Sequence, residues 1–336
     1  PIAVMKAGGA YMPLDYTLPS ERLKFMCEDA GVNLILNEGT KVSDALPDFT
    51  GRVLTTEEAI NLPPTSYTLD ITRRASAGNA MVVLYTSGTT GMPKGVILEY
   101  GGIVNFCYWY TDEFDVTEQD RSLAYANFGF DAHMIDIYPA LTCGASAYII
   151  PSEMRMNPEA MNEYMNDNDL NVAFMTNQIG YMFIETLQNR SLRTLTMGGE
   201  KWKAIKKPAF DLYNVYGPTE CTLFSTYYPV KQDYTGSQIG RPLANYNLYV
   251  LDNNMRTLPQ GVQGELVIGG AGVGRGYLNN PELTEEKFIP INREHLYRTG
   301  DLVRWNEEGQ LEYIGRIDNQ IKLRGYRIEL GAIESK

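Results

Sequence analysis

The stretch that decides the fold reads MVVLYTSGTTGMPKG and covers residues 81–95. Its first five residues, Met81–Tyr85, form an uninterrupted apolar run, which is typical of a strand buried on both faces. The residues that follow are mostly hydroxyl side chains and glycines, and they include Lys94. Glycines let backbone N–H groups approach an anion closely, and hydroxyl and lysine side chains add further donors. The pattern therefore predicts a strand that leads into a polyphosphate-binding loop.

Two other nucleotide-binding motifs do not fit this chain. Lys94 is not preceded by glycine, and Gly95 follows it where a Walker A loop has Ser or Thr. The glycine-rich run at residues 269–276 does not satisfy GxGxxG, which removes the dinucleotide-binding interpretation. Composition alone would also fit a plain Ser/Thr/Gly loop that binds nothing.

Outward from this loop, strand-like and helix-like segments alternate. Residues 145–150, 172–175 and 192–197 are expected to be further buried strands. Asn157 and Pro158 are typical of a helix start, and residues 179–187 place apolar side chains at helical spacing. This alternation predicts an α/β fold. Beyond residue 240, short strands between Gly and Asn turns are expected at 246–252, 264–268 and 310–314, so we expect a β-rich subdomain there.

Composition excludes several classes of protein. The 336 residues carry 29 Lys and Arg against 41 Asp and Glu, a net charge of −12, which argues against nucleic-acid binding through overall charge. Four cysteines are too few for a disulfide scaffold, and two histidines leave no His-rich metal site. No apolar run reaches the roughly 18 residues of a spanning helix, so we expect no membrane partner and a cytoplasmic location. Because the chain begins at Pro1, we expect a piece of a longer polypeptide.

Six segments in order carry a resemblance to a known family. They are KAGGAYMPLD (6–15), the phosphate loop (85–95), FDA (130–132), NVYGPTE (214–220), YRTGDL (297–302) and a segment that runs from GRID (315–318) to RGYRIEL (324–330). These segments resemble the motifs of the adenylate-forming superfamily, which includes acyl-CoA ligases, luciferases and adenylation domains. The whole chain is most similar to the amino-acid adenylation domains of nonribosomal peptide synthetases.

The resemblance implies an α/β fold with a large N-terminal core, built from layered αβα subdomains and a β-rich subdomain. On this basis we expect an α/β part with the phosphate loop and amino-acid pocket at 1–240, the β-rich subdomain at 241–317, and a hinge with the start of a second unit at 318–336. Asp318 would be the hinge residue. The small C-terminal subdomain and its catalytic lysine would be mostly missing, so the fragment itself is expected to be weakly active or inactive. Residues 61–79, rich in Pro, Ser and Thr, are expected to be a surface connection.

The resemblance also implies a reaction. An amino acid would be activated by ATP and Mg²⁺ as the aminoacyl-AMP, with release of pyrophosphate. It would then be loaded as a thioester onto the phosphopantetheine of a peptidyl carrier domain, next to other synthetase domains. Glu220 and Thr90 would hold Mg²⁺, and Thr86, Lys94, Glu220 and Arg316 would be catalytic. The residues expected to bind ATP are Thr86, Ser87, Gly88, Thr89, Thr90, Gly91, Lys94, Gly198, Gly199, Glu200, Asn214, Tyr216, Gly217, Thr219, Asp301, Tyr313 and Arg316.

Asp131 is the most informative residue for the substrate. In the family an aspartate here pairs with the α-ammonium group, and a partly buried carboxylate needs such a partner. The expected pocket residues are Asp131, Ala132, Ile135, Gln178, Leu195, Met197, Val215, Leu223 and Phe224. They add no charge opposite the guest side chain, so a small neutral amino acid is expected, with glycine or alanine first and a small aliphatic residue second.

Three alternatives stay open. Asp131 could be a helix N-cap rather than an ammonium ligand. The chain could be an acyl-CoA ligase for another carboxylic acid, or a non-catalytic module that binds ATP or docks a carrier. His133 stands where the family usually has a small residue, and it fits a packing role better than a catalytic one.

Overall fold

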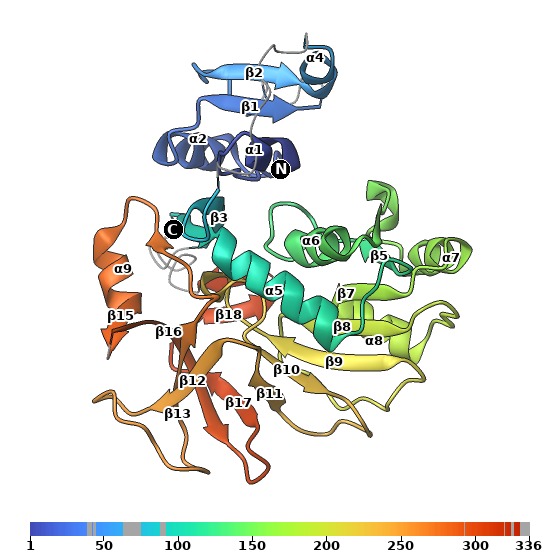
Figure 1. Ribbon diagram of the computed structural model, residues 1–336, viewed down its shortest axis with the longest axis vertical. Helices are drawn as coiled ribbons and strands as arrows, with labels where there is room; N and C mark the ends of the chain where they lie inside the picture. Colours follow the sequence, from blue (N-terminus) through green and yellow to red (C-terminus); the bar gives the residue numbers. More distant parts are fainter. Residues whose placement is uncertain are drawn as a thin grey trace.

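The computed structural model describes residues 1–38, 42, 45–62, 75–87, 92–291, 293–318, 320–323 and 326–329. Its largest feature is a twelve-stranded sheet in the order β12-β13-β16-β17-β11-β10-β9-β8-β7-β5-β6, with β15 paired to β16 (Figure 1). The predicted α/β fold is confirmed, because one half of this sheet is parallel with helical crossovers and the other half is antiparallel.

The parallel half contains β5 (Arg121–Ala124), β6 (Ser146–Ile149), β7 (Val172–Thr176), β8 (Thr194–Gly198) and β9 (Asp211–Tyr216). The three runs predicted to be buried strands are β6, β7 and β8. β7 and β8 are buried as predicted, whereas β6 lies at the edge of the sheet and its residues are half-buried or exposed, so its predicted burial was wrong. The crossovers are α6 (His133–Cys143), α7 (Pro158–Asp167) and α8 (Asn177–Glu185), and α7 begins where predicted, with the Asn157 side chain accepting from Ala160 N–H.

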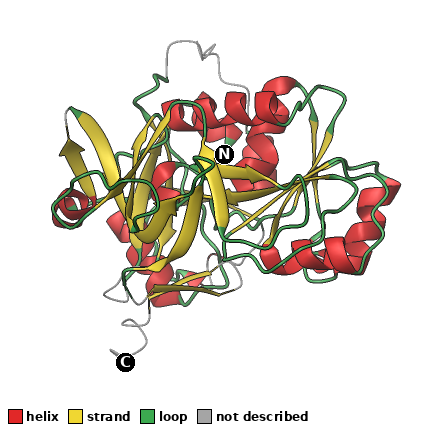
Figure 2. Cartoon of the chain, turned by 90° about the horizontal axis from the view of Figure 1, so that it is seen from below, coloured by secondary structure: helices red, strands yellow, loops and turns green. Residues whose placement is uncertain are grey.

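The direction of the crossovers changes at β5. The step from β5 to β6 moves one way along the sheet, whereas the steps from β6 to β7 and from β7 to β8 move the other way. Because crossovers are right-handed, α6 covers one face and α7 and α8 cover the opposite face. Figure 2 shows helices on both sides of the strands. Ligands of open α/β sheets bind at the carboxyl ends of the strands beside such a reversal.

The antiparallel half confirms the predicted β-rich strands after residue 240. It contains β10 (Thr226–Pro229), β11 (Gln238–Pro242), β12 (Tyr246–Leu251), β13 (Gly264–Gly270), β15 (Phe288–Ile291), β16 (Glu294–Trp305) and β17 (Leu311–Arg316), with α9 (Pro281–Lys287) before β15. The chain also has a separate hairpin of β18 (Gln320–Leu323) and β19 (Tyr326–Glu329).

The strand predicted before the phosphate loop is β3 (Ala80–Thr86), and it lies in a second, antiparallel sheet with β4 (Lys94–Glu99) and β14 (Gly276–Tyr277). Thr86 pairs with Lys94, so the loop is a hairpin connection between β3 and β4. Tyr11 adds a parallel bridge to Val82. β14 belongs to the later, β-rich part of the sequence, yet it pairs with β4. The division at residue 240 stays a prediction.

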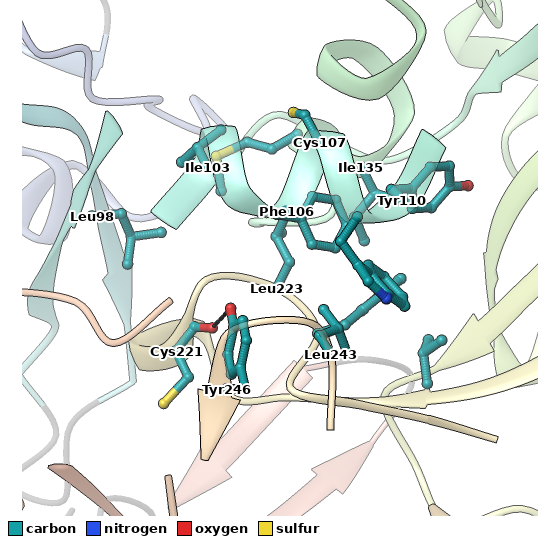
Figure 3. Packing of buried hydrophobic residues seen from close by; sticks show 14 of the residues in the cluster. Leu98, Ile103, Phe106, Cys107, Tyr110, Ile135, Cys221, Leu223, Leu243 and Tyr246 are labelled. Atoms are coloured by element: carbon teal, nitrogen blue, oxygen red, sulfur yellow. Dashed lines mark hydrogen bonds between the residues drawn. The ribbon is translucent and has the colours of Figure 1, made fainter. Parts of the chain in front are cut away.

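A hydrophobic core joins the two sheets around α5 (Tyr100–Glu113). Figure 3 shows Phe106 of α5 pointing toward Leu223, with Ile135 of α6 beside it. Phe106 is fully buried, and its ring lies 5.3 Å from that of Phe224. Truncation of a buried Phe to Ala costs about 3–5 kcal/mol. A second core, which includes Met161 and Phe183, lies under α7 and α8 on the other face of the parallel strands.

The N-terminal elements form a small unit at one end of the molecule (Figure 1). Their own core contains Leu23, Cys27, Ile35 and Leu46. The elements are α1 (Ile2–Lys6), α2 (Ser20–Asp29), β1 (Leu34–Asn37), β2 (Arg52–Thr55) and α4 (Thr56–Ile60). Among the residues that the structure describes, no helix is long and apolar enough to cross a bilayer.

Candidate active site

Two adjoining cavities, each of about 280 Å³, open at the carboxyl ends of β5, β7, β8 and β9. The first extends from the end of β3 to the loop between β5 and α6. The second lies beside β9, β11 and β17. The cavities share a wall that consists of Gly199, Val215, Gly217, Asp301 and Arg316. A ligand with two linked parts can therefore occupy both.

Thr86 and Ser87 line one end of the first cavity, where β3 ends. The Thr86 Oγ1 atom is buried and has no hydrogen-bond partner among the described residues. Buried polar atoms are nearly always satisfied, so an orphan oxygen at a cavity wall indicates a polar ligand. This observation fits a phosphate oxygen at Thr86. Gly88, Thr89, Thr90 and Gly91, which were also expected here, lie outside the described residues.

Lys94 and Glu220 meet in the interior, and neither lines the two cavities. The Lys94 Nζ atom lies 3.3 Å from Glu220 Oε1, and both side chains are almost completely buried. Tyr277 of β14 donates a hydrogen bond of 2.8 Å to the same carboxylate oxygen and accepts one of 3.1 Å from Lys94. A buried carboxylate is costly unless it is paired, and this arrangement supplies the pair. Lys94 was expected at the phosphates, and in the structure its ammonium group lies against Glu220.

The expected Mg²⁺ site is described only in part. Of its two predicted protein ligands, Glu220 is described and Thr90 is not. Glu220 is an oxygen donor of the kind that Mg²⁺ prefers, although one of its oxygens bonds to Lys94 and Tyr277. Within the described ranges, no three His, Cys, Asp or Glu side chains gather as metal ligands would.

Asp301 of β16 and Arg316 of β17 both lie in the shared wall. They are directly opposite each other in the antiparallel pairing of these two strands. Asp301 accepts hydrogen bonds from Tyr216, at 2.5 Å, and from Arg316, at 3.0 Å. Arg316 also binds Asp318 through Nε and Nη2, at 2.8 and 2.5 Å. The guanidinium thus joins the predicted ribose-binding carboxylate to the predicted hinge residue.

The second cavity has flat aromatic walls. The rings of Tyr216 and Tyr313 lie 6.3 Å apart at 40°, and burial raises the pKa of Tyr216 well above its ordinary value. Asn214 is buried at its edge and donates a hydrogen bond of 2.8 Å to the Gln238 carbonyl. Such walls suit a planar heterocycle. Of the residues predicted to bind nucleotide, this cavity is lined by Gly199, Glu200, Asn214, Tyr216, Gly217, Asp301, Tyr313 and Arg316, while Gly198 and Thr219 line the first cavity.

Three carboxylates among the described residues line the first cavity, those of Asp15, Asp131 and Asp301. Asp131 follows β5 and accepts a hydrogen bond of 2.5 Å from Thr219 Oγ1. The helix α6 begins at His133, and its N-cap residue is Ala132, so Asp131 is not the N-cap. Six predicted pocket residues line this cavity: Asp131, Ala132, Ile135, Val215, Leu223 and Phe224.

Gln178, Leu195 and Met197 do not line the cavity. Gln178 is exposed on α8. Leu195 and Met197 pair in register with Ala173 and Met175 of β7, so all four side chains lie on the same face. That face packs into the second core under α8, away from the cavity. Phe174 lies on the opposite face and lines the cavity, which the sequence did not reveal.

His133 is buried behind the cavity and 1% exposed. Its Nδ1 lies 2.5 Å from the Phe130 carbonyl oxygen, which can only accept, so we assign the ring proton to Nδ1. Nε2 then accepts from the Tyr11 hydroxyl at 2.7 Å. Burial lowers the pKa of His133 to about 4, so the ring is neutral at physiological pH. This geometry favours the packing role.

Asp136, in the first turn of α6, holds the other end of the same loop. Its Oδ2 accepts from the backbone N–H groups of Tyr125 and Ala126 at 2.8 and 2.7 Å. Burial raises the pKa of this carboxyl to about 8. The two buried side chains of α6 therefore fix the loop that carries Asp131.

Comparison with known proteins gives consistent matches. A family model described as AMP-binding enzyme matches residues 2–278. The chain is 41% identical over 342 residues to surfactin synthase subunit 1 of Bacillus subtilis (strain 168), with 99% of this chain and 9% of that protein covered. It is 37% identical over 338 residues to bacitracin synthase 1 of Bacillus licheniformis, and this match covers 100% of this chain and 6% of that protein. The chain thus spans less than a tenth of the length of these relatives.

Solved structures show the same fold. A four-domain nonribosomal peptide synthetase bound to AMP and glycine is 33% identical, with a TM-score of 0.81, and the match covers 99% of this chain and 25% of that chain. An adenylation domain from Vibrio cholerae in complex with glycyl-adenosine-5'-phosphate is 23% identical, with a TM-score of 0.82. This match covers 99% of this chain and 70% of that chain.

Proposed function

Because the chain belongs to the AMP-binding enzyme family, we propose that it activates a small neutral amino acid as the aminoacyl-AMP. The observation that carries the proposal is the position of Asp131. This carboxylate lies at the apolar end of the first cavity, and Asp301 and Arg316 in the shared wall connect that cavity to the aromatic one. An aminoacyl-AMP has the matching order of groups, with an ammonium at one end, a phosphate in the middle and adenosine at the other end.

In the proposed reaction a carboxylate oxygen of the amino acid attacks the α-phosphorus of ATP. The new bond joins that oxygen to phosphorus, and the bond from the α-phosphorus to the bridging oxygen breaks, so pyrophosphate leaves with the electron pair. Asp131 binds the α-ammonium and fixes the direction of attack. The Thr86 hydroxyl donates to a phosphate oxygen, which satisfies its orphan Oγ1.

Adenosine occupies the second cavity in this proposal. The rings of Tyr216 and Tyr313 pack against the base, and Asp301 accepts from the ribose hydroxyls. Glu220 and Thr90 are the residues that would hold Mg²⁺, which would neutralise phosphate charge. Lys94 contributes by pairing with Glu220 and keeping it in place.

A second step is proposed from the similarity to peptide synthetases. In it, the thiol of a phosphopantetheine group on a carrier domain attacks the aminoacyl carbonyl, and AMP leaves. The carrier and its neighbouring synthetase domains would then be partners of this chain. An acyl-CoA ligase acting on fatty or aryl acids would have no ammonium to pair with Asp131, which makes that alternative weaker.

The test measures the binding of non-hydrolysable 5'-O-(aminoacyl)sulfamoyl adenosines and of AMP, together with ATP–pyrophosphate exchange over the common amino acids and several fatty and aryl acids. We expect the glycyl and alanyl analogues to bind much more tightly than AMP. Asp131→Asn should weaken the analogues about 100-fold, because it leaves a desolvated ammonium unpaired, and should leave AMP binding unchanged. Glu185→Gln, on the exposed side of α8, is the control. Equal binding by wild type and Asp131→Asn, or exchange with fatty acids alone, would contradict the proposal.

A further inference from the structure

The segment at residues 11–15, in the KAGGAYMPLD motif, is bonded to β3 through its backbone. The Tyr11 N–H group donates to the Met81 carbonyl at 3.1 Å, and the Tyr11 carbonyl accepts from Val83 N–H at 3.0 Å. β3 ends at Thr86, whose hydroxyl is proposed to bind a phosphate oxygen. The main chain of residue 11 is therefore fixed to the strand that carries the phosphate end of the site.

The side chain of Tyr11 reaches α6 through a chain of hydrogen bonds. Its hydroxyl accepts a bond of 2.8 Å from Tyr138 and donates one of 2.7 Å to His133 Nε2. The His133 Nδ1–H group donates at 2.5 Å to the carbonyl of Phe130, the residue before Asp131. The three donors all point in the same direction along this chain, an arrangement in which buried hydrogen bonds strengthen one another. Tyr11 thereby fixes the ring that holds the backbone beside Asp131.

A second contact joins the same segment to the loop between β5 and α6. The Asn127 side chain, near the start of this loop, donates a bond of 3.2 Å to Asp15 Oδ2. His133, just after the loop, also stacks on Phe128 within it, with ring centroids 4.9 Å apart and an angle of 23°. The segment at residues 11–15 therefore contacts both ends of the loop that carries the proposed ammonium ligand.

We propose that residues 11–15 hold Asp131 at a set distance from Thr86, with Tyr11 as a positioning residue that acts through His133. One aminoacyl-AMP would bind to Asp131 through its ammonium and to Thr86 through its phosphate. The distance between these two groups of the ligand is limited by covalent bonds, so affinity depends on how well the protein fixes the matching distance. This inference rests on the proposed amino-acid activation and deepens it.

The experiment measures dissociation constants for 5'-O-(glycyl)sulfamoyl adenosine and for AMP. Tyr11→Phe removes the hydroxyl that bonds to His133 and Tyr138, but it keeps the ring and the backbone bonds to β3, so it should fold. We expect this variant to bind the glycyl analogue about tenfold more weakly than the wild type does. AMP has no ammonium group, so it should bind equally to both proteins.

A double-mutant cycle with Asp131→Asn separates positioning from a general loss of structure. If Tyr11 acts through Asp131, Tyr11→Phe should have almost no further effect in the Asp131→Asn protein, because the ammonium contact is already lost. Tyr227→Phe is the matched control. Tyr227 is also buried and its hydroxyl donates 2.8 Å to Glu113, but neither residue lines a cavity, so this variant should bind the analogue as the wild type does.

Two variants of His133 repeat the test without a change at Tyr11. His133→Leu removes both ring hydrogen bonds and should weaken the glycyl analogue at least as much as Tyr11→Phe. His133→Gln has an amide oxygen that can accept from Tyr11, so it should recover part of that affinity. Wild-type affinity in both Tyr11→Phe and His133→Leu, or a tenfold loss that persists in the Asp131→Asn protein, would overturn the positioning role. If the wild type bound AMP but not the glycyl analogue, the proposed function itself would fail.

Discussion

His133 and Asp136 lie within one turn of α6. Burial shifts their pKa values in opposite directions. The His133 pKa falls to about 4, and the Asp136 pKa rises to about 8. Both changes favour the neutral side chain, because each group is almost completely removed from water. The loop that carries Asp131 is therefore anchored by two uncharged buried groups that titrate on either side of neutrality.

We predict that His133 makes the protein less stable in mild acid. The folded-state pKa lies below the ordinary value of about 6.5, so the stability that His133 contributes is present above that pH and is lost as the pH falls toward 4. Relative to His133→Gln, the free energy of unfolding of the wild type should drop by about 2 kcal/mol between pH 8 and pH 5. Urea unfolding at several pH values measures this, and parallel curves for the two proteins would refute it.

Asp136 should give the opposite trend. Its folded-state pKa lies above the unfolded value, so its contribution is largest at low pH and is lost as the pH rises toward 8. Compared with Asp136→Asn, the wild type should lose on the order of 2 kcal/mol or more of stability between pH 5 and pH 8. The same urea series tests this prediction. A difference that stays constant over that range would show that the carboxyl titrates normally.

At the scale of elements, the two-residue strand β14 has an effect out of proportion to its length. It brings Tyr277 from the later part of the sequence to β4, so that its hydroxyl reaches both Lys94 and Glu220. The ring also packs against Phe288 at 5.4 Å. One short pairing thus connects the second sheet to the carboxylate proposed to hold Mg²⁺.

We predict a graded loss of stability at this cluster. Lys94→Met leaves a buried carboxylate without its cation and should cost about 3–5 kcal/mol. Tyr277→Phe removes the hydroxyl that donates to that carboxylate and accepts from Lys94, but it leaves the ion pair in place, and should cost about 1–3 kcal/mol. Combining Lys94→Met with Glu220→Gln should recover part of the loss, because the stranded charge is gone. Chemical denaturation of the wild type and the three variants measures these losses in the free energy of unfolding. Equal losses for the two single variants would argue against a buried ion pair.

Elements with a strong local signal could be predicted from the sequence. The apolar runs of β7 and β8 and the Asn157–Pro158 start of α7 appear where expected, because burial and capping leave a clear pattern of residues. β14 could not be predicted, since two residues carry no periodicity. The face of β8 was also hidden: every residue of this strand is buried, so no alternation tells which side chains meet the cavity. Leu195 and Met197 were expected in the pocket from the family resemblance, and no alternation in β8, or in β7 with Phe174, was there to correct that expectation.

At the scale of the whole molecule, the sheet topology places the site. The crossovers reverse at β5, and both cavities lie at the carboxyl ends of the strands next to that reversal. Motifs more than two hundred residues apart in the sequence, such as Thr86 and Arg316, therefore line one cavity. The residue types of the site could be predicted from its motifs, but the partners of its cations could not. Pairing across the fold, rather than sequence spacing, assigns Lys94 to Glu220 and Arg316 to Asp301.

The position of Arg316 between two carboxylates has a thermodynamic consequence. Its guanidinium bonds to Asp301, which is proposed to receive the ribose, and to Asp318, the proposed hinge residue. A nucleotide that draws Asp301 toward its hydroxyls changes the charge that Arg316 experiences, and with it the strength of the bond to Asp318. By reciprocity, a rotation at Asp318 that breaks this bond would alter nucleotide affinity by the same free energy. Through Arg316, nucleotide binding and motion at residue 318 would therefore be thermodynamically coupled.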